Sequence, residues 1–116
     1  MGTTIKILFS FFVAIHGLIH LMGFAKAFGF AEMSQLTQPI SKLQGMAWLV
    51  AALLFSASIP TYLLRKDWWW MIALAAIVIS QLVIFLSWQD AKFGTIANVI
   101  ILIVVILGYG NFSATP

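Results

Sequence analysis

The sequence predicts an all-α protein, a four-helix transmembrane bundle in up-down-up-down order. Of its 116 residues, 63% are hydrophobic and 8% are charged, whereas soluble domains carry about 25% charged residues. Four apolar stretches stand out, at about 5–24, 45–64, 68–88 and 95–110. A helix needs about 20 apolar residues, or about 17 at the least, to cross the hydrocarbon, so the first three stretches qualify easily and the fourth lies close to this lower limit. We expect a single integral membrane domain over residues 1–116, in contact with the lipid bilayer.

The first stretch has a second interpretation, as a secretory signal. Lys6, the apolar run and Ala25-Lys26-Ala27 are typical of an n-region, an h-region and an A-x-A cleavage site. The run from Ile7 to Phe24 is longer than the usual h-region of about 7–15 residues, and two histidines interrupt it. We therefore expect a membrane helix here.

The connections predict antiparallel neighbours. The longest, at 28–43, leads into Ser41-x-x-Gln44, the pattern of a capping box that would open the second helix. Arg65-Lys66-Asp67 is a tight polar turn between the second and third helices, and 89–94 is a short turn before the fourth. Short turns leave consecutive helices side by side and antiparallel.

Aromatic and basic residues mark the expected membrane faces. Rings are enriched at headgroup level, and they divide here into Trp48 and Trp88 at one face and Tyr62, Trp68, Trp69, Trp70 and Tyr109 at the other. The six basic residues are scattered at segment ends, so we interpret them as interface anchors and expect no nucleic-acid partner. They divide equally between the faces, and the dense Arg65-Lys66 cluster favours cytoplasmic termini.

His16 and His20 are the strongest functional clue. They lie four residues apart, on the same face of the first helix. Ionisable groups inside a hydrocarbon span are costly, and they usually mark a site or pair with a neighbour. Such a pair can chelate a metal ion, although the glutamate of the H-E-x-x-H pattern is absent. The alternative is that the imidazoles only hydrogen-bond other helices and maintain packing.

Further polar residues fall in the same half of the predicted bundle. Gln81, Trp88 and Gln89 share a face of the third helix at i, i+7 and i+8. We predict a half-membrane pocket with six ligand-binding residues, His16, His20, Gln81, Trp88, Asp90 and Asn98. The plainer alternative treats the amides as interhelical hydrogen bonds worth about 0.6 kcal/mol each. It treats Asp90 as a helix N-terminal charge or a rim partner of Lys92.

Several motifs are absent from the sequence. With no cysteine, thiol chemistry, disulfides and thiolate metal sites are excluded. Neither G-x-x-x-x-G-K nor G-x-S-x-G occurs, so nucleotide hydrolysis and serine-hydrolase chemistry have no support. No self-contained set of acid, base and nucleophile is visible.

Two stretches carry a resemblance, His16-Gly-Leu-Ile-His20-Leu-Met-Gly23-Phe-Ala-Lys26-Ala-Phe-Gly29 and Ser87-Trp-Gln-Asp90-Ala-Lys-Phe-Gly94-Thr-Ile-Ala-Asn98. Together they resemble a group of small, uncharacterised four-helix bacterial membrane proteins. More distantly, Gly23-x-x-Lys26-x-x-Gly29 is similar to DoxX-like proteins, which share four helices over the whole length. The resemblance implies a bacterial inner-membrane subunit linked to quinone oxidoreduction or to a redox partner. The His16/His20 pair departs from it.

Three functions follow from the sequence. The first is a ligand-binding or redox-accessory membrane subunit that takes a quinone-like ligand or a metal ion at His16 and His20. The second is a structural partner subunit, bound to another membrane protein, whose histidines only maintain packing. The third is a small proton-coupled homodimeric transporter in which the histidine pair carries the proton. The sequence identifies no particular cofactor.

Overall fold

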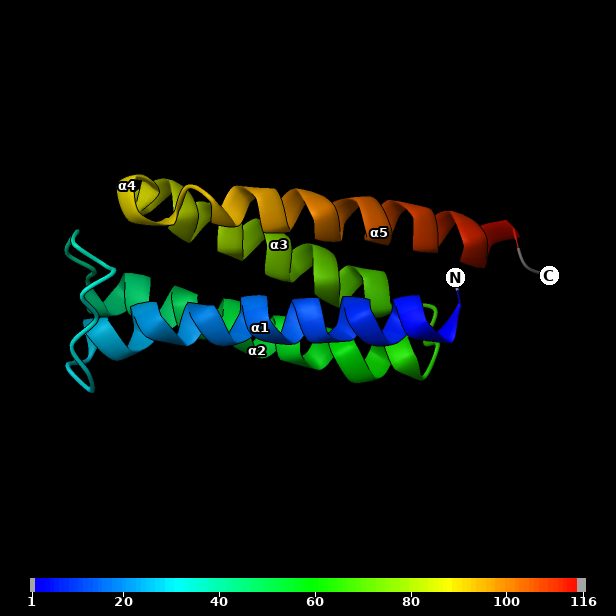
Figure 1. The fold of residues 1–116 in the computed structure, drawn as a ribbon, viewed down its shortest axis with the longest axis horizontal. Helices are drawn as coiled ribbons and strands as arrows, with labels where there is room; N and C mark the ends of the chain where they lie inside the picture. Colours follow the sequence, from blue (N-terminus) through cyan, green and yellow to red (C-terminus); the bar gives the residue numbers. More distant parts are fainter. Residues whose placement is uncertain (1, 115–116) are drawn as a thin grey trace.

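The structure is a computed structural model that describes the backbone of residues 2–114 and the side chains of residues 2–108. Within that part the secondary structure is helical, as expected (Figure 1). The helices are α1 (Thr3–Ala27), α2 (Lys42–Leu63), α3 (Trp69–Leu86), α4 (Trp88–Ala91) and α5 (Gly94–Ala114).

Three of the helices are long and apolar enough to cross a membrane. They are α1, α2 and α3, with 25, 22 and 18 residues, and a helix rises about 1.5 Å per residue against about 30 Å of hydrocarbon. The apolar part of α5 within the described side chains, Gly94–Gly108, is shorter. The prediction of a membrane protein is therefore confirmed on three of the four expected spans.

The helices pack in chain order. α1 lies against α2, α2 against α3, and α3 against α5, whereas α1 meets α5 only locally. In Figure 1 the α1–α2 connection and α4 lie at one end of the molecule, and the N-terminus lies with the α2–α3 turn at the opposite end. We call the first of these the α4 end.

The closest helix pair is α1 with α2. The buried residues of α1 fall on one stripe: Val13, His16, Gly17, His20 and Gly23. Without side chains, the two glycines let α2 approach closely, and a Cβ at Gly23 would overlap the Trp48 indole. Small residues at such contacts are how helices associate in lipid, where apolar burial contributes little.

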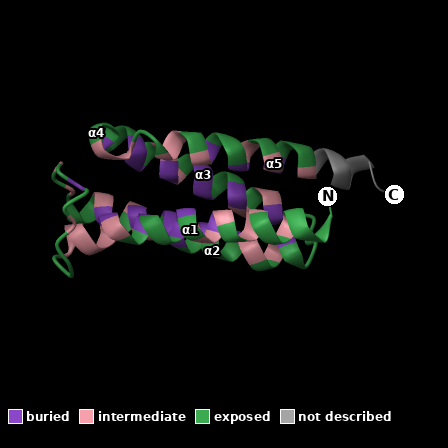
Figure 2. Cartoon of the chain, in the orientation of Figure 1, coloured by how far each residue is buried: buried purple, intermediate pink, exposed green. Residues whose placement is uncertain are grey.

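Within the long helices, the buried residues lie on the sides that face other helices (Figure 2). Figure 2 shows buried residues on the facing sides and exposed residues around the outside. The exposed face is apolar, with Phe11 65% and Phe85 62% exposed, because the surrounding lipid tails are as apolar as these side chains. The main core cluster comprises Val13, Phe55, Tyr62, Trp69, Ala73, Ala76, Ile77, Ile101 and Val105.

The capping box that opens the second helix is confirmed. The main-chain N–H of Gln44 donates to Ser41 Oγ, and the main-chain N–H of Ser41 donates to Gln44 Oε1, both at 3.1 Å. Two main-chain N–H groups at the start of α2, which would otherwise lack acceptors, are thereby hydrogen-bonded.

The aromatic belts differ from expectation. Trp68 and Trp88 are exposed, but Trp48, Trp69 and Tyr62 are buried between helices. Trp48 occupies the space that Gly23 leaves open. The Trp69 and Tyr62 rings meet edge to face, with their centroids 4.8 Å apart. The space available between the helices therefore determines where these three rings lie, and the hydropathy of the sequence does not reveal that space. The side chain of Tyr109 lies outside the described residues.

The third helix is shorter than predicted. It ends at Leu86 rather than at position 88, because Ser87 leaves the helical conformation with φ −120° and ψ 38°. The Ser87 carbonyl then accepts from the N–H groups of Asp90 (3.0 Å) and Ala91 (2.9 Å), which starts α4. The stretch expected to be a plain turn thus contains a short helix that redirects the chain.

The contact between Gly23 and Trp48 gives a stability prediction. We expect Gly23→Ala to destabilise the protein by about 1–3 kcal/mol, the usual effect of overpacking a tight contact. Gly2→Ala is the matched control, because a Cβ there meets nothing within 4 Å. Denaturant unfolding in detergent micelles measures both, and equal stability of the two variants would contradict the close α1–α2 packing.

Candidate functional site

Polar side chains from three helices meet in the apolar interior. His16 Nε2 lies 2.8 Å from Asn98 Oδ1, and His20 Nε2 lies 2.7 Å from Ser80 Oγ. Asn98 Nδ2 donates to Ser80 Oγ at 2.9 Å, which closes the connection. We call these four buried residues the histidine network. It ties α1 to both α3 and α5.

The network continues toward the α4 end through two half-buried residues. Asn98 Nδ2 also donates to Gln81 Oε1 at 3.0 Å, and Gln81 Nε2 donates to Thr95 Oγ1 at 2.9 Å. Thr95 is the second residue of α5. The polar chain therefore runs from the interior of the bundle to the start of its last helix.

The acceptors in the network determine where the protons of neutral imidazoles lie. An amide oxygen and a carbonyl oxygen can only accept. His16 must therefore donate from Nε2 to Asn98 Oδ1, and His20 must donate from Nδ1 to the His16 carbonyl, 2.7 Å away. His20 Nε2 then carries a lone pair, and the Ser80 hydroxyl donates to it. The two rings are opposite tautomers.

This arrangement leaves one imidazole nitrogen available. Both nitrogens of His20 are engaged, by the His16 carbonyl and by Ser80. His16 has Nε2 engaged, and its Nδ1 has no partner within the described residues. His16 Nδ1 is therefore the one nitrogen of the two imidazoles that is left to accept a further hydrogen bond.

Aromatic rings enclose the two imidazoles. The His16 and His20 rings lie perpendicular to one another with centroids 4.7 Å apart. Phe55, which is fully buried, lies 5.0 Å from the first ring and 5.4 Å from the second, and Trp48 lies 5.5 Å from His20. Hydrogen bonds in such dry surroundings are stronger than in water.

Four of the six predicted site residues come together, and two do not. Trp88 is 46% exposed and stacks on Phe85 with ring centroids 5.8 Å apart. Because α3 ends at Leu86, Trp88 belongs to α4 and does not continue the face of Gln81. The predicted i, i+7 alignment of Gln81 with Trp88 is thereby lost.

Asp90 binds the α1–α2 connection instead of the histidines. Its carboxylate accepts from Thr37 Oγ1 at 2.6 Å, Thr37 N at 2.7 Å and Gln38 N at 2.8 Å. The hydrogen bond from the Thr37 side chain, followed by that from the Gln38 amide, holds the pKa of Asp90 below its ordinary value. Asp90 is therefore a charged anchor at the α4 end.

Two members of the polar chain were missed from the sequence. Ser80 is the only hydroxyl-bearing residue of α3 and directly precedes Gln81. A hydroxyl within so apolar a run could have been recognised as a partner for the helix-1 histidines. Thr95 begins the last helix and offered no comparable signal, because its position beside Gln81 arises only from packing.

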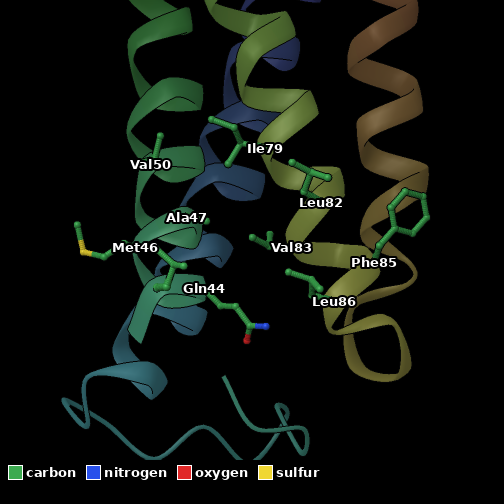
Figure 3. A pocket seen from close by; sticks show the side chains of 10 residues that line it. Gln44, Met46, Ala47, Val50, Ile79, Leu82, Val83, Phe85 and Leu86 are labelled. Atoms are coloured by element: carbon green, nitrogen blue, oxygen red, sulfur yellow. The ribbon is translucent and has the colours of Figure 1, made fainter. Parts of the chain in front are cut away.

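A separate apolar groove runs between α2 and α3 (Figure 3). It has a volume of about 660 Å³, and its walls include Met46, Val50, Leu82 and Phe85. The Gln44 side chain also lines it, but its oxygen caps α2. Neither histidine lines the groove, so it is distinct from the histidine network.

No family model, curated protein sequence or solved structure matches this chain. The geometry of the histidine network is therefore the basis for assigning a function.

The hydrogen bonds predict opposite tautomers. At neutral pH, we expect ¹⁵N NMR to show His16 protonated at Nε2 and His20 protonated at Nδ1. Ser80→Ala should move the His20 Nε2 resonance toward that of an unbound lone pair, because its donor is removed. Finding the same tautomer in both rings would contradict the arrangement.

Proposed function

We propose that this chain is a ligand-binding or redox-accessory membrane subunit whose ligand contacts His16 Nδ1. The single observation that supports this is the unpaired nitrogen of a buried ring whose other nitrogen is held by Asn98. Because Asn98 already holds the ring through Nε2, its Nδ1 is a preorganised acceptor, and a preorganised group binds a donor with less loss of conformational freedom.

A quinone-like molecule suits this donor set better than a metal ion does. The hydroxyl of a quinol can donate to His16 Nδ1, and the rings of Phe55 and Trp48 line the surroundings of the imidazoles. A metal ion needs several ligands. The described residues contain no group of three or more histidine, aspartate or glutamate side chains that could supply them, and His20 has no free nitrogen.

A second function, proton-coupled transport by a homodimer, is favoured by one observation. Ser80 Oγ lies 3.3 Å from Asn98 Oδ1, so its proton can turn there if His20 becomes protonated at Nε2. The path outward passes through the amides of Asn98 and Gln81. Amide groups hold their protons too firmly to relay them readily, so the ligand-binding role is the better supported.

We also propose that α5 completes a four-helix, up-down-up-down transmembrane bundle. It has 21 residues, or about 31 Å at 1.5 Å per residue, close to the hydrocarbon thickness. Both termini would lie in the cytoplasm of a bacterial inner membrane, on the side of the Arg65-Lys66 turn.

Single cysteines test this arrangement, because the chain contains none of its own. We expect cysteines at Glu32 and Lys92 to react with an impermeant thiol reagent from the periplasmic side only. Cysteines at Lys66 and Ala114 should react from the cytoplasmic side only. Labelling of the Lys92 and Ala114 positions from the same side would show that α5 does not cross.

Replacement of His16 tests the proposed ligand contact. His16→Asn removes the imidazole lone pair, so we expect the affinity for decylubiquinol in lipid nanodiscs to fall about tenfold or more, as for a lost buried hydrogen bond. His20→Asn should weaken binding less, since both nitrogens of His20 are already engaged and neither contacts the proposed ligand. Each variant should lose about 0.6 kcal/mol of stability and at most about 1.7 kcal/mol, the range for such bonds in lipid.

Ser58→Ala is the matched control. Ser58 is a buried hydroxyl whose hydrogen bond goes to the Phe55 carbonyl of its own helix. This variant should bind decylubiquinol like the wild type. If His16→Asn folds and binds as tightly as the control, the histidines serve packing alone and the structural interpretation holds.

A further inference from the structure

The α1–α2 connection is held from two sides where it crosses the α4 end. Lys26 Nζ, in the last turn of α1, donates to the carbonyl oxygens of Leu36 and Gln38. Asp90 of α4 accepts from the N–H groups of Thr37 and Gln38. Residues 36–38, which we call the strap, therefore lie between a cation and an anion carried by different helices.

The strap is also seated by an apolar contact. Leu36 is 9% exposed, whereas its neighbours Gln35 and Thr37 are exposed. A buried leucine with charged partners on its flanking peptides gives the strap one defined position across the end of the bundle.

The anchors of the strap stand on the elements that carry the histidine network. Lys26 follows His20 by six residues on α1, roughly 9 Å along the axis at 1.5 Å per residue. Asp90 lies in α4, which leads directly into the helix of Thr95 and Asn98. Figure 1 shows the connection and α4 together at this end. The strap therefore lies at the end of the bundle from which Thr95, Gln81 and Asn98 lead inward (Figure 1).

We propose that the strap is a gate that controls the access of water to the histidine network. The inference rests on the proposed function, because the network that the gate would keep from water contains the proposed ligand contact, His16. The bonds between Asp90 and Thr37 are exposed to solvent, so water competes with them. The strap can therefore open locally while the buried helix contacts remain.

The experiment measures access to the network directly. Ser80→Cys places a nearly isosteric thiol at a fully buried position of this cysteine-free chain. In nanodiscs, where both faces are accessible, a charged methanethiosulfonate reagent should label it slowly. Adding Asp90→Asn weakens the charged anchor, and we expect labelling about tenfold faster, as for a local opening made easier by lost bonds. Asp67→Asn, in the turn at the opposite end, should leave the rate unchanged.

Thr37→Ala provides a second test, because it removes one exposed hydroxyl donor and leaves Asp90 in place. It should raise the rate by a smaller factor. Equal labelling rates in the parent, the Asp90→Asn variant and the Thr37→Ala variant, all folded by circular dichroism, would overturn the gate. Decylubiquinol binding by the His16 variants is measured separately. If the strap controls labelling but the protein binds no quinol, the proposed ligand is refuted and the gate is not.

Discussion

The hydrogen-bond requirement of polar groups in an apolar interior is the constraint on which this structure depends. A polar side chain that faces neither water nor headgroups is costly to bury unless it finds a hydrogen-bond partner inside the protein. The two histidines of α1 find theirs on α3 and α5, with which α1 is in much less extensive contact than with α2. The histidine network thus joins the α1–α2 pair to the α3–α5 pair, which the close glycine contacts of α1 do not reach.

The same requirement distinguishes the two halves of the bundle. Near the α4 end, the polar atoms of His20, Ser80 and Asn98 are joined in a continuous chain. In the other half, Tyr62 Oη and Trp69 Nε1 are buried without hydrogen-bond partners, and their rings pack against each other. Aromatic packing holds the helices together in that half, whereas hydrogen bonds hold them together around the histidines. Directional bonds also define which imidazole nitrogen is left without a bond, namely Nδ1 of His16.

The strap and the histidine network are linked through covalent continuity. Lys26 and His20 share α1, and Asp90 precedes the helix that presents Asn98. A small displacement of α1 relative to α5 would therefore alter the hydrogen bond between His16 and Asn98 and the spacing of the strap anchors together. The charged bonds at the α4 end and the neutral bonds within the bundle are therefore carried by the same elements of the chain.

The sequence by itself determined the all-helical membrane character, the capping box at Ser41 and the shared face of His16 and His20, because hydropathy and helical periodicity are local properties. It also indicated Gln81 and Asn98, since amides inside apolar runs need partners. Only the tertiary structure decided that Ser80 completes the network, that Trp48 is buried against Gly23, and that Asp90 binds the strap. These outcomes depend on which helices become neighbours and where the third helix ends. Both are set by contacts between residues far apart in the chain, which no local pattern encodes.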